Sequence, residues 1–554
     1  MGKSRVRKKT PVNKYSFREY AKELLRHERG YISLKKEAPV RIALVYPNTY
    51  EVGMANLGFQ SVYRLLNEHP EVRCERAFVE DPEFKLEVRT LESQERLGHF
   101  TLIGFSLSFE LDLVHIIKCL IRSGIPTLTG DRKEKDPLVI LGGAVAGLNP
   151  SPLLPFMDGL LVGEGEGIFC KIGDILFVEG EKRSSREKKL QALGEIEGFF
   201  IPGLHSSVKR RTVRSLKKYP IYTPIITSKS HFSNMFVVEV SRGCPQKCYF
   251  CGAKKIYHPY RSHPVESILD IVKCKNPGAN RIGLEGAGLS DYPDLVKLCA
   301  SLVETGKKLS LSSIRPDRVQ PDLLDLMAKG DVRTFTVAPE TGSETLREQI
   351  GKGMSNSTLR NVVGLLARSK IYMLKLYFLI GLPGETKEDM LAIIHLVSEL
   401  HAHFINKNRK KRIRISVNAF IPKPFTEFQW AAMATEKELL EKRKIIKRGL
   451  KGKKGLDILT KSTRQEILQG VLSLGDESVG LSVLDGVKKG IPWKSALKEN
   501  GIDVASLIHQ ERSVDTYFPW DFIEPSFTKN KMWKDYQQYN MNLKKGVVSN
   551  GTRG

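Results

Sequence analysis

Buried β-type segments alternate with helical segments along most of this 554-residue chain, and this alternation limits its fold more than any other feature. In the first part the expected strands cover residues 41–46, 101–108, 138–141 and 159–162, and the clearest helices cover 56–67 and 110–123. Strands that alternate with helices form a parallel sheet with helices on both faces. The first part therefore predicts a doubly wound α/β domain that binds its ligand at the carboxyl ends of the strands.

The same alternation returns after residue 233. Six expected strands cover residues 236–240, 281–284, 309–312, 334–337, 373–380 and 413–420, with a helix between most neighbours. About six consecutive βα units predict a partial (β/α)6 barrel of the TIM type, whose functional residues lie at the carboxyl ends of the strands.

The chain is too long for one ordinary core, so several domains are expected. The pattern divides it into a basic N-terminal extension (1–38), the doubly wound domain (39–180), a charged linker (181–232), the barrel (233–430) and a C-terminal helical region (431–554). In the last region Thr435 and Glu438 have the spacing of a capping box that opens a long basic helix. The final twenty residues are polar and are expected to fray.

Three cysteines follow the first barrel strand with the spacing C-x3-C-x2-C, at Cys244, Cys248 and Cys251. Thiolates are soft ligands that hold iron–sulfur clusters. Such a cluster usually has four protein ligands, so three cysteines would leave one iron open. A structural zinc site is the alternative, with His258 as a fourth ligand. The other five cysteines lack ligand spacing and are expected to be buried thiols: Cys74, Cys119, Cys170, Cys274 and Cys299.

Further motifs follow the cysteines in order, each after an expected strand. They are LEGAG (284–288), SSIRP (312–316), APETGS (338–343) and IGLPGET (380–386). Together with the cysteine loop they resemble the radical S-adenosylmethionine (radical SAM) enzymes, and the likeness runs from about residue 40 to about residue 430. The resemblance implies a [4Fe–4S] cluster whose open iron binds the amino and carboxylate groups of S-adenosylmethionine. It also implies reductive cleavage to a 5′-deoxyadenosyl radical, and an electron donor such as a flavodoxin or ferredoxin.

The same resemblance implies roles for residues at the strand ends. Phe250 would help to seat the adenine, or would simply pack. Glu285 stands where relatives bind the amino group, although the order here is L-E-G-A-G rather than G-G-E. Ser313 would suit the ribose hydroxyls, and the planar fork of Arg315 would suit the methionyl carboxylate. Glu340 would bind ribose or lie near the sulfonium.

The first domain resembles the Rossmann-like, cobalamin-binding-like domain that precedes the barrel in many radical SAM enzymes, on the stretch 142–166. Several segments, among them 47–63 and 421–430, resemble a group of bacterial members without an assigned substrate. Cobalamin domains with a histidine on cobalt carry D-x-H-x-x-G. Here Asp112 and His115 have the wrong spacing, so any cobalamin would bind without that ligand.

The formal charge of +26 is gathered in runs, including 407–414 and 442–454. If the substrate is RNA, Lys407–Arg414 and Lys442–Arg448 are expected to rim the active site and contact phosphates. Three functions stay open: RNA or tRNA modification, modification of a small molecule or lipid (methylation, methylthiolation or rearrangement), and a non-catalytic cluster-binding protein. No membrane span or secretory signal is expected, and the oxygen-sensitive cluster fits the cytoplasm.

Overall fold

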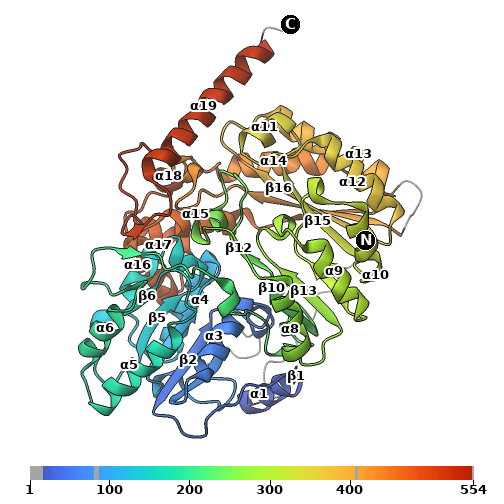
Figure 1. The fold of residues 1–554 in the computed structure, drawn as a ribbon. Coiled ribbons are helices and arrows are strands. Elements are labelled where there is room, and N and C mark those ends of the chain that lie inside the picture. The colour runs from blue at the N-terminus through green and yellow to red at the C-terminus, as the bar shows by residue number, and fades with distance from the viewer. Residues whose placement is uncertain (1–15, 80–86, 406–409, 552–554) are drawn as a thin grey trace, which may run out of the picture.

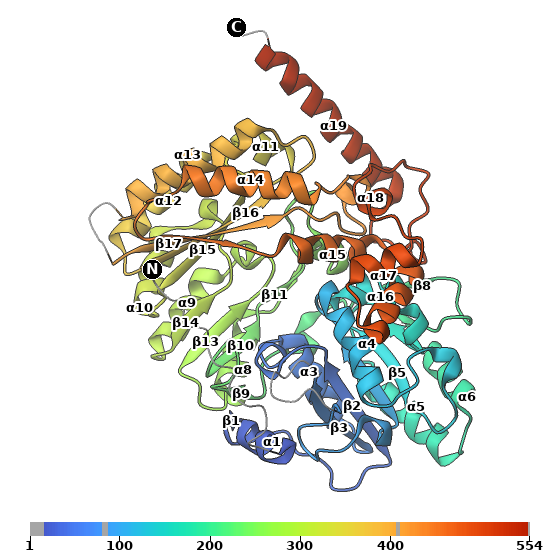
Figure 2. The same ribbon diagram turned by 180° about the vertical axis from the view of Figure 1, so that it is seen from behind.

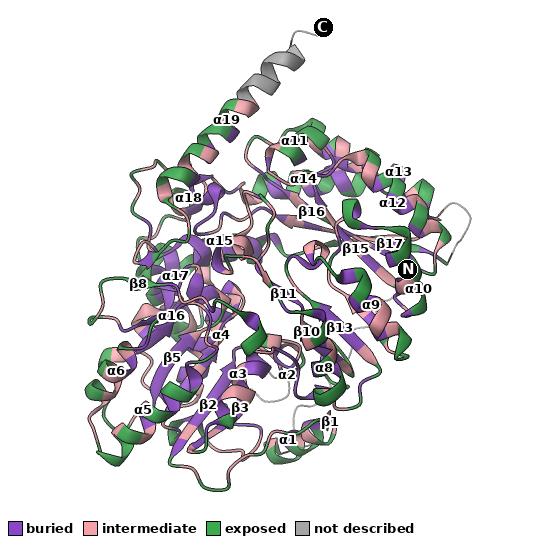
Figure 3. Ribbon diagram, in the orientation of Figure 1, coloured by how far each residue is buried: buried purple, intermediate pink, exposed green. Residues whose placement is uncertain are grey.

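The computed structural model describes residues 16–79, 87–405 and 410–551. Two sets of parallel strands lie side by side, and the C-terminal helices run along both (Figure 1). Buried residues follow both sets of strands, and exposed residues lie mainly on the outer helices (Figure 3). Among the helices in these ranges, none is both long enough and apolar enough to cross a bilayer.

The first sheet has the strand order β3-β2-β4-β5-β6-β7. Its strands are β2 (Val40–Tyr46), β3 (Val72–Phe78), β4 (Leu102–Ser106), β5 (Leu138–Gly142), β6 (Gly159–Leu161) and β7 (Phe199–Phe200). All neighbours are parallel except β6 and β7. The chain adds strands first on one side of β2 and then on the other, which confirms the doubly wound prediction and puts the topological switch between β2 and β4.

Strand β3 was not predicted, because charged residues interrupt its apolar pattern. Glu75 and Arg76 are fully buried on this strand, and both are paired. Burial of charge is favourable only with such partners, so the pattern that normally marks a strand is hidden here.

Side chains alternate between the two faces of this sheet. Ile42 and Leu44 point to one face, which α3 (Leu57–Glu68) and α5 (Phe169–Glu181) cover. Ala43 and Val45 point to the other face, against α4 (Leu113–Arg122). The second face belongs to the same apolar core as the barrel, so the two units share one continuous core.

The barrel consists of two adjoining parallel sheets, ordered β10-β13-β14 and β15-β16-β17-β18. The strands are β10 (Met235–Glu239), β13 (Arg281–Glu285), β14 (Lys308–Leu311), β15 (Thr334–Glu340), β16 (Met373–Ile380), β17 (Arg412–Ala419) and β18 (Leu456–Thr460). The helices between them are α8 (Val265–Lys275), α9 (Leu295–Glu304), α10 (Pro321–Lys329), α11 (Glu344–Gln349), α12 (Asn356–Arg368), α13 (Lys387–Ile405) and α14 (Glu436–Gly449). The predicted partial barrel is confirmed, with β18 as a seventh strand from a region expected to be helical.

The C-terminal helices connect the two units rather than capping the barrel alone. They are α15 (Thr463–Leu474), α16 (Glu477–Lys489), α17 (Trp493–Glu499), α18 (Val504–Ile508) and α19 (Lys529–Gly551). Helix α16 packs on α4 of the first unit, and the start of α19 packs beside the barrel. The rest of α19 projects away from the body (Figures 1 and 2), so the described part of the last twenty residues, up to Gly551, is helical where fraying was expected.

The segment 181–232, expected to be a linker, is built into the fold. It contains α6 (Arg186–Gly194) and β7, which extends the first sheet. It also contains β9 (Ile226–Thr227), which pairs with β1 (Glu28–Arg29), and β8 (Val208–Lys209), which pairs with β19 (Ile523–Glu524). Short strands without a clear period hid these pairings from the sequence.

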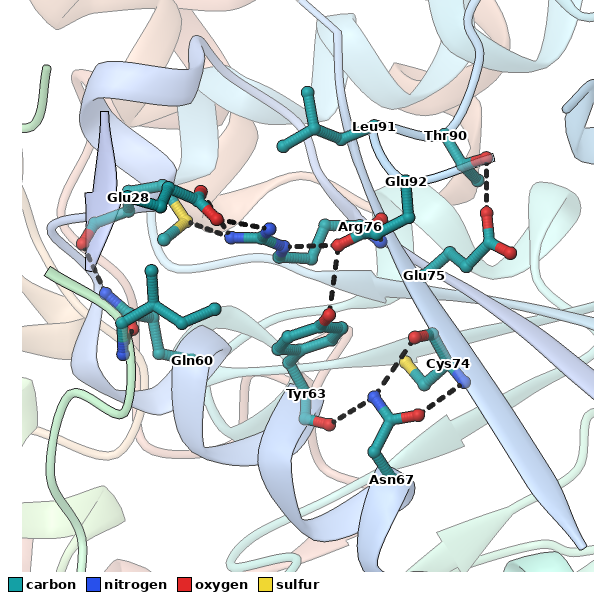
Figure 4. Close-up of polar contacts among 12 residues, drawn as sticks. Glu28, Gln60, Tyr63, Asn67, Cys74, Glu75, Arg76, Thr90, Leu91 and Glu92 are labelled. Atoms are coloured by element: carbon teal, nitrogen blue, oxygen red, sulfur yellow. Dashed lines mark hydrogen bonds and ion pairs between the residues drawn. The ribbon is translucent and has the colours of Figure 1, made fainter. Parts of the chain in front are cut away.

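The described part of the N-terminal extension is docked on the first unit, while residues 1–15 lie outside the described residues. Helix α1 (Phe17–Arg26) opens with a capping box from Ser16, and β1 follows it. Figure 4 shows how the buried guanidinium of Arg76 binds both Glu28 oxygens, at 2.8 and 2.9 Å, and Glu92 at 2.7 Å. The hydroxyl of Tyr50 also donates to Glu28. The segment from α1 to β1 is therefore a fixed part of the fold.

We expect Glu28→Gln to loosen this docking, because it leaves the buried Arg76 with one carboxylate instead of two. Removing one partner of a buried pair costs about 3 kcal/mol. Native-state hydrogen exchange of β2 and β3 amides should show an opening free energy lower by about that amount. The matched control is Glu23→Gln, an exposed residue of α1 that pairs with Arg26, and it should change the opening free energy by less than about 0.5 kcal/mol. Equal protection of the β2 and β3 amides in both variants would contradict a role of the Glu28–Arg76 ion pair in docking this segment.

Candidate active site

The cysteine loop leaves the barrel at the carboxyl end of β10. Strand β11 (Ser241–Arg242) pairs antiparallel with β12 (Arg261–Ser262), and this pair closes the loop from 243 to 260. Gly243 has φ +81°, and a Cβ there would lie 2.5 Å from the carbonyl oxygen of Tyr257. Only glycine fits at this position, so the chain can turn directly into the cysteines.

Two contacts hold the loop from either side. Helix α7 (Gly252–Ile256) begins directly after Cys251, and its Lys255 forms a buried ion pair with Glu427 at 2.7 Å. On the other side the amide of Tyr249 donates to the carbonyl of Ile350 at 3.1 Å. The loop is therefore anchored both to the end of the barrel and to the connection after α11.

The three thiols lie in protected surroundings. Cys248 is 8% exposed, and Cys244 and Cys251 are partly buried. Burial raises the pKa of Cys244, and it raises that of Cys248 to about 12, so both thiols are neutral without a metal. Within the described ranges, no three His, Cys, Asp or Glu side chains converge on one point as the ligands of a single ion do. The donor set still fits a four-iron cluster, because each cysteine then binds a different iron.

The connection from residue 350 to 354 is seated against the cysteine loop. Gly351 has φ +74°, and a Cβ there would lie 2.4 Å from the carbonyl oxygen of Lys247. The ammonium of Lys352 binds Glu340 at 2.8 Å. Burial opposes its charge, but Glu340 raises the pKa of Lys352, so a partly buried cation lies beside the cysteines. Glu340 adopts φ +68°, a left-handed conformation that ordinary residues avoid outside constrained sites.

Arg315 supports the same connection. Its guanidinium pairs with Asp317 at 3.0 and 3.1 Å and donates to the carbonyls of Lys352 and Gly353. In this structure the side chain holds the loop in place rather than standing open to a ligand. Its role toward the methionyl carboxylate stays a prediction.

The other predicted residues lie in different surroundings. Glu285 ends β13 and lines a cavity, and its carboxylate forms no hydrogen bond or ion pair with the described residues. Desolvation of this carboxylate, and then the charge of Glu239, raise its pKa. Ser313 is exposed after β14. Phe250 is half-buried against the core. The structure therefore gathers Arg315 and Glu340 around Lys352 at the cysteine loop, and puts Glu285 at the cavity.

A buried ion network joins the two units beneath the cysteine loop. Arg242, two residues before Cys244, binds Glu166 at 2.6 Å and Glu239 at 2.9 and 2.8 Å. Arg261 binds both oxygens of Glu164, at 2.9 and 2.6 Å. Burial opposes the charge of Glu239, but Arg242 and His263 lower its pKa to about 2. The glutamates of the loop after β6 are thus tied to the strand that carries the cysteines.

A cavity of about 560 Å³ lies between the two units. Its walls come from the carboxyl ends of β4, β5 and β6 in the first sheet and of β10 and β13 in the barrel. Gly104 and Gly142 face it from neighbouring strands, and a Cβ at either would meet no atom closer than 3.6 Å. Gly243 also lines it, so the cavity reaches the start of the cysteine loop.

Sequence reasoning missed several residues of this site. Lys352 carried only a weak signal, the two glycines that flank it. Arg242 stands beside the motif without belonging to its spacing, and Glu164 and Glu166 lie in the stretch 142–166, where the sequence indicates no individual role for them. Two cysteine predictions were wrong, since Cys170 and Cys274 are exposed, on the outer faces of α5 and α8.

The expectation that basic runs rim the active site is wrong for the described part of the first run and for Lys442 and Arg443, whereas Lys444, Lys447 and Arg448 are exposed. The run 407–414 enters β17 at its amino end, opposite the end where the cysteines lie, and residues 406–409 are not described. Lys411 is buried and donates to three backbone carbonyls. Lys442 pairs with Glu385, and the buried Arg443 pairs with Glu466. These cations stabilise the fold instead of facing solvent.

We expect Gly351→Val to displace the cysteine loop, because the new Cβ would overlap the Lys247 carbonyl. Gly353→Val is the matched control: it has φ +52°, but no atom lies within 4 Å of its Cβ position. Both variants carry similar backbone strain, and only the first carries the clash. In metal-free protein, brief iodoacetamide treatment followed by mass spectrometry should label Cys248 at least about tenfold faster in Gly351→Val than in the control. Equal labelling would mean that the contact does not seat the loop.

Comparison with known proteins agrees with this geometry. Residues 58–202 match the family model for the N-terminal part of radical SAM proteins, and residues 238–397 match the radical SAM superfamily. The uncharacterized protein MJ0966 of Methanocaldococcus jannaschii is 30% identical over 468 residues, which cover 83% of this chain and 94% of that protein.

Two further relatives match over shorter stretches. The ribosomal protein uS12 methylthiotransferase RimO of Aquifex aeolicus is 26% identical over 40% of this chain and 54% of its own length. The tRNA-2-methylthio-N(6)-dimethylallyladenosine synthase of Anaplasma phagocytophilum is 26% identical over 42% and 57%. The chain thus spans just over half the length of these two.

Among solved structures, the cobalamin-dependent radical enzyme OxsB is similar over 92% of this chain and 80% of its own, with 12% identity and a TM-score of 0.46. A likeness this low carries no argument about function. The two family models and the full-length relative do: with its cysteine loop at the strand ends of a partial barrel, this chain belongs to the radical S-adenosylmethionine superfamily of enzymes, which use a [4Fe–4S] cluster and S-adenosylmethionine.

Proposed function

We propose that this enzyme cleaves S-adenosylmethionine reductively at a [4Fe–4S] cluster held by Cys244, Cys248 and Cys251, and so starts radical chemistry on a substrate in the adjoining cavity. The observation that carries the proposal is the place of the cysteine loop, which is anchored on both sides at the strand ends and opens to the cavity through Gly243. When bound, the cluster supplies the electron that breaks the sulfonium C–S bond. A flavodoxin or ferredoxin would supply that electron, in a reducing cytoplasm.

The chain's own residues prepare this site in three ways. Burial around Cys248 excludes water from the loop. Lys352 puts a positive charge beside the thiolates, which offsets part of their negative charge. Glu285, unpaired and open to the cavity, would accept hydrogen bonds from the ammonium group of S-adenosylmethionine. Ser313, Glu340 and Phe250 keep their proposed places near the ribose and adenine.

Cys248→Ala tests the cluster ligands. The variant should lose the visible absorption and iron of anaerobically reconstituted protein, and 5′-deoxyadenosine formation should fall to background, because two cysteines do not hold the cluster. Cys274→Ser, which changes an exposed cysteine far from the loop in sequence, should keep both. Undiminished iron content and activity in Cys248→Ala would show that Cys248 is not a cluster ligand. Iron without 5′-deoxyadenosine in the unaltered enzyme would favour the non-catalytic alternative.

Glu285→Gln should weaken S-adenosylmethionine binding by roughly 10- to 100-fold, as for a lost hydrogen bond to a charged group, and should leave the iron content unchanged. Equilibrium dialysis of the reconstituted enzyme measures this, with Glu304→Gln on α9 as the exposed control. Arg315→Ala separates two roles of that residue. Weaker binding with full iron content would support a carboxylate ligand, whereas loss of iron would support a residue that only seats the loop. Unchanged binding in Glu285→Gln would remove it from the site.

We propose cobalamin as a second cofactor for the cavity. The supporting observation is the glycine-lined end of the first sheet at its topological switch, where a flat ring system has room. The cavity lining contains no histidine. Asp112 accepts a hydrogen bond from Asn48, and His115 contacts the carbonyl of Pro47. Any cobalamin here would therefore lack a histidine on cobalt.

RNA modification is the second candidate function. The charge of +26 favours it, as does the likeness to the tRNA-modifying synthase of Anaplasma phagocytophilum, whereas RimO modifies a ribosomal protein. The buried and paired state of Lys411, Lys442 and Arg443 counts against a phosphate-binding rim made by these residues. A small-molecule or lipid substrate fits a cavity of about 560 Å³ better. RNA binding that weakens steeply with salt would reverse this preference.

A further inference from the structure

Three residues that line the cavity each carry a buried polar atom with no hydrogen-bond partner among the described residues. The atoms are Ser61 Oγ on α3, Arg210 Nε and Ser241 Oγ on β11. All three residues are less than a tenth exposed. Buried polar atoms are almost always paired, so a cluster of exceptions around one cavity indicates a ligand with polar groups of its own.

Arg210 is the most informative of the three. Its terminal nitrogens donate to the carbonyls of Gly147 and Lys255 and to the hydroxyl of Ser526. It stacks over Phe425 at 4.8 Å. No carboxylate of the described chain lies within ion-pair distance, and burial lowers its pKa to about 10. A buried cation without a counter-charge is costly, and a bound anion would remove that cost.

The contrast with other buried arginines supports this reading. Arg242, which lines the same cavity, has three carboxylates around it. Arg347 has no carboxylate, but its Nε and both terminal nitrogens donate to carbonyl or amide oxygens of the chain. Arg210 alone of these three combines an open Nε with the missing anion. Guanidinium groups bind carboxylates and phosphates through planar pairs of hydrogen bonds.

The opposite part of the cavity is apolar. It lies on the face of the first sheet between α3 and α5, and its walls are Leu44, Leu102, Ile140, Leu161, Leu65, Phe169 and Ile172. Gly104 on β4 leaves room above this face, as noted above. Arg210, by contrast, contacts α7 through the carbonyl of Lys255, so the charged end is the one nearer the cysteine loop.

We propose that the cavity binds an amphiphilic anion as the substrate: an apolar body lies between α3 and α5, and its carboxylate or phosphate is held by Arg210. Only the role of this anion as substrate rests on the proposed function, because its binding to the cavity does not depend on catalysis. It puts the carbon atoms next to the anionic group nearest the cysteine loop.

Calorimetric titration of the anaerobically reconstituted, full-length enzyme tests the proposal with decanoate, decyl phosphate and decanol. We expect at least one of the two anions to bind at least about tenfold tighter than decanol, and the better anion identifies the head group. Acetate and inorganic phosphate, which lack the apolar body, should bind much more weakly than the ten-carbon anions. Equal affinity for decanol and both anions would overturn the role of Arg210.

Two variants separate the charged end from the apolar end. Arg210→Gln should weaken binding of the anions by roughly 10- to 100-fold and leave decanol unchanged, which also reports that the cavity is intact. Lys209→Gln removes the same charge from the exposed neighbour and should change nothing. Gly58→Leu should fill the cavity and abolish binding of all three probes, because a Cβ there meets only Asn56 Oδ1, at 3.4 Å.

The control for the filled cavity is Gly364→Leu, a glycine of α12 with no atom within 4 Å of its Cβ position and no part in the cavity. It should bind the probes as the unaltered enzyme does. A different result would overturn the proposal: none of the ten-carbon probes binds, hydroxocobalamin does bind, and Gly58→Leu abolishes its binding. That result would assign the cavity to cobalamin. Iron loss in Cys248→Ala is measured separately, so failure here is distinguishable from failure of the proposed function.

Discussion

The network of Arg242, Arg261, Glu164, Glu166 and Glu239 is the interaction on which the site depends. These charges are buried between the two units, where an unpaired charge would cost far more than a surface one. Their geometry is therefore demanding: each arginine meets its carboxylates at 2.6–3.3 Å. Because Arg242 stands two residues before Cys244, the same bonds that join the units also fix where the cysteine loop begins.

The carboxyl ends of two parallel sheets face each other across this network, and the cavity is the space between them. Parallel strands bring the loops that carry function to one edge, and here two such edges meet. One edge supplies the cysteines and Glu285, and the other supplies small residues that leave room for a ligand. The C-terminal helices stabilise this meeting, because α16 packs on α4 and α15 packs on residues 110–112 of the first unit. Glu466 of α15 also accepts a hydrogen bond from the amide of Ala419 at the end of β17.

Several cations of this protein are buried and stabilise the fold. Arg76, Arg347, Lys411 and Arg443 are all buried, and each donates to carboxylates, carbonyls or hydroxyl groups of the chain. A formal charge of +26 therefore overstates the positive surface that is open to a partner. Arg210 departs from this rule, and the departure is what gives the cavity a chemical preference.

The sequence by itself determined the fold class and the reactive motif. The βα alternation predicted both parallel units, and strands such as β16 match their expected ranges, because local periodicity depends on neighbours in sequence. The C-x3-C-x2-C spacing likewise marked the loop without any tertiary contact. Strands β3 and β18 and the pairing of β1 with β9 escaped prediction, since their stability comes from partners far along the chain. Only the tertiary structure brought Glu164 to Arg261 and Lys352 to the cysteine loop, and left Arg210 without an anion, because burial and pairing are properties of the packed chain and not of any segment.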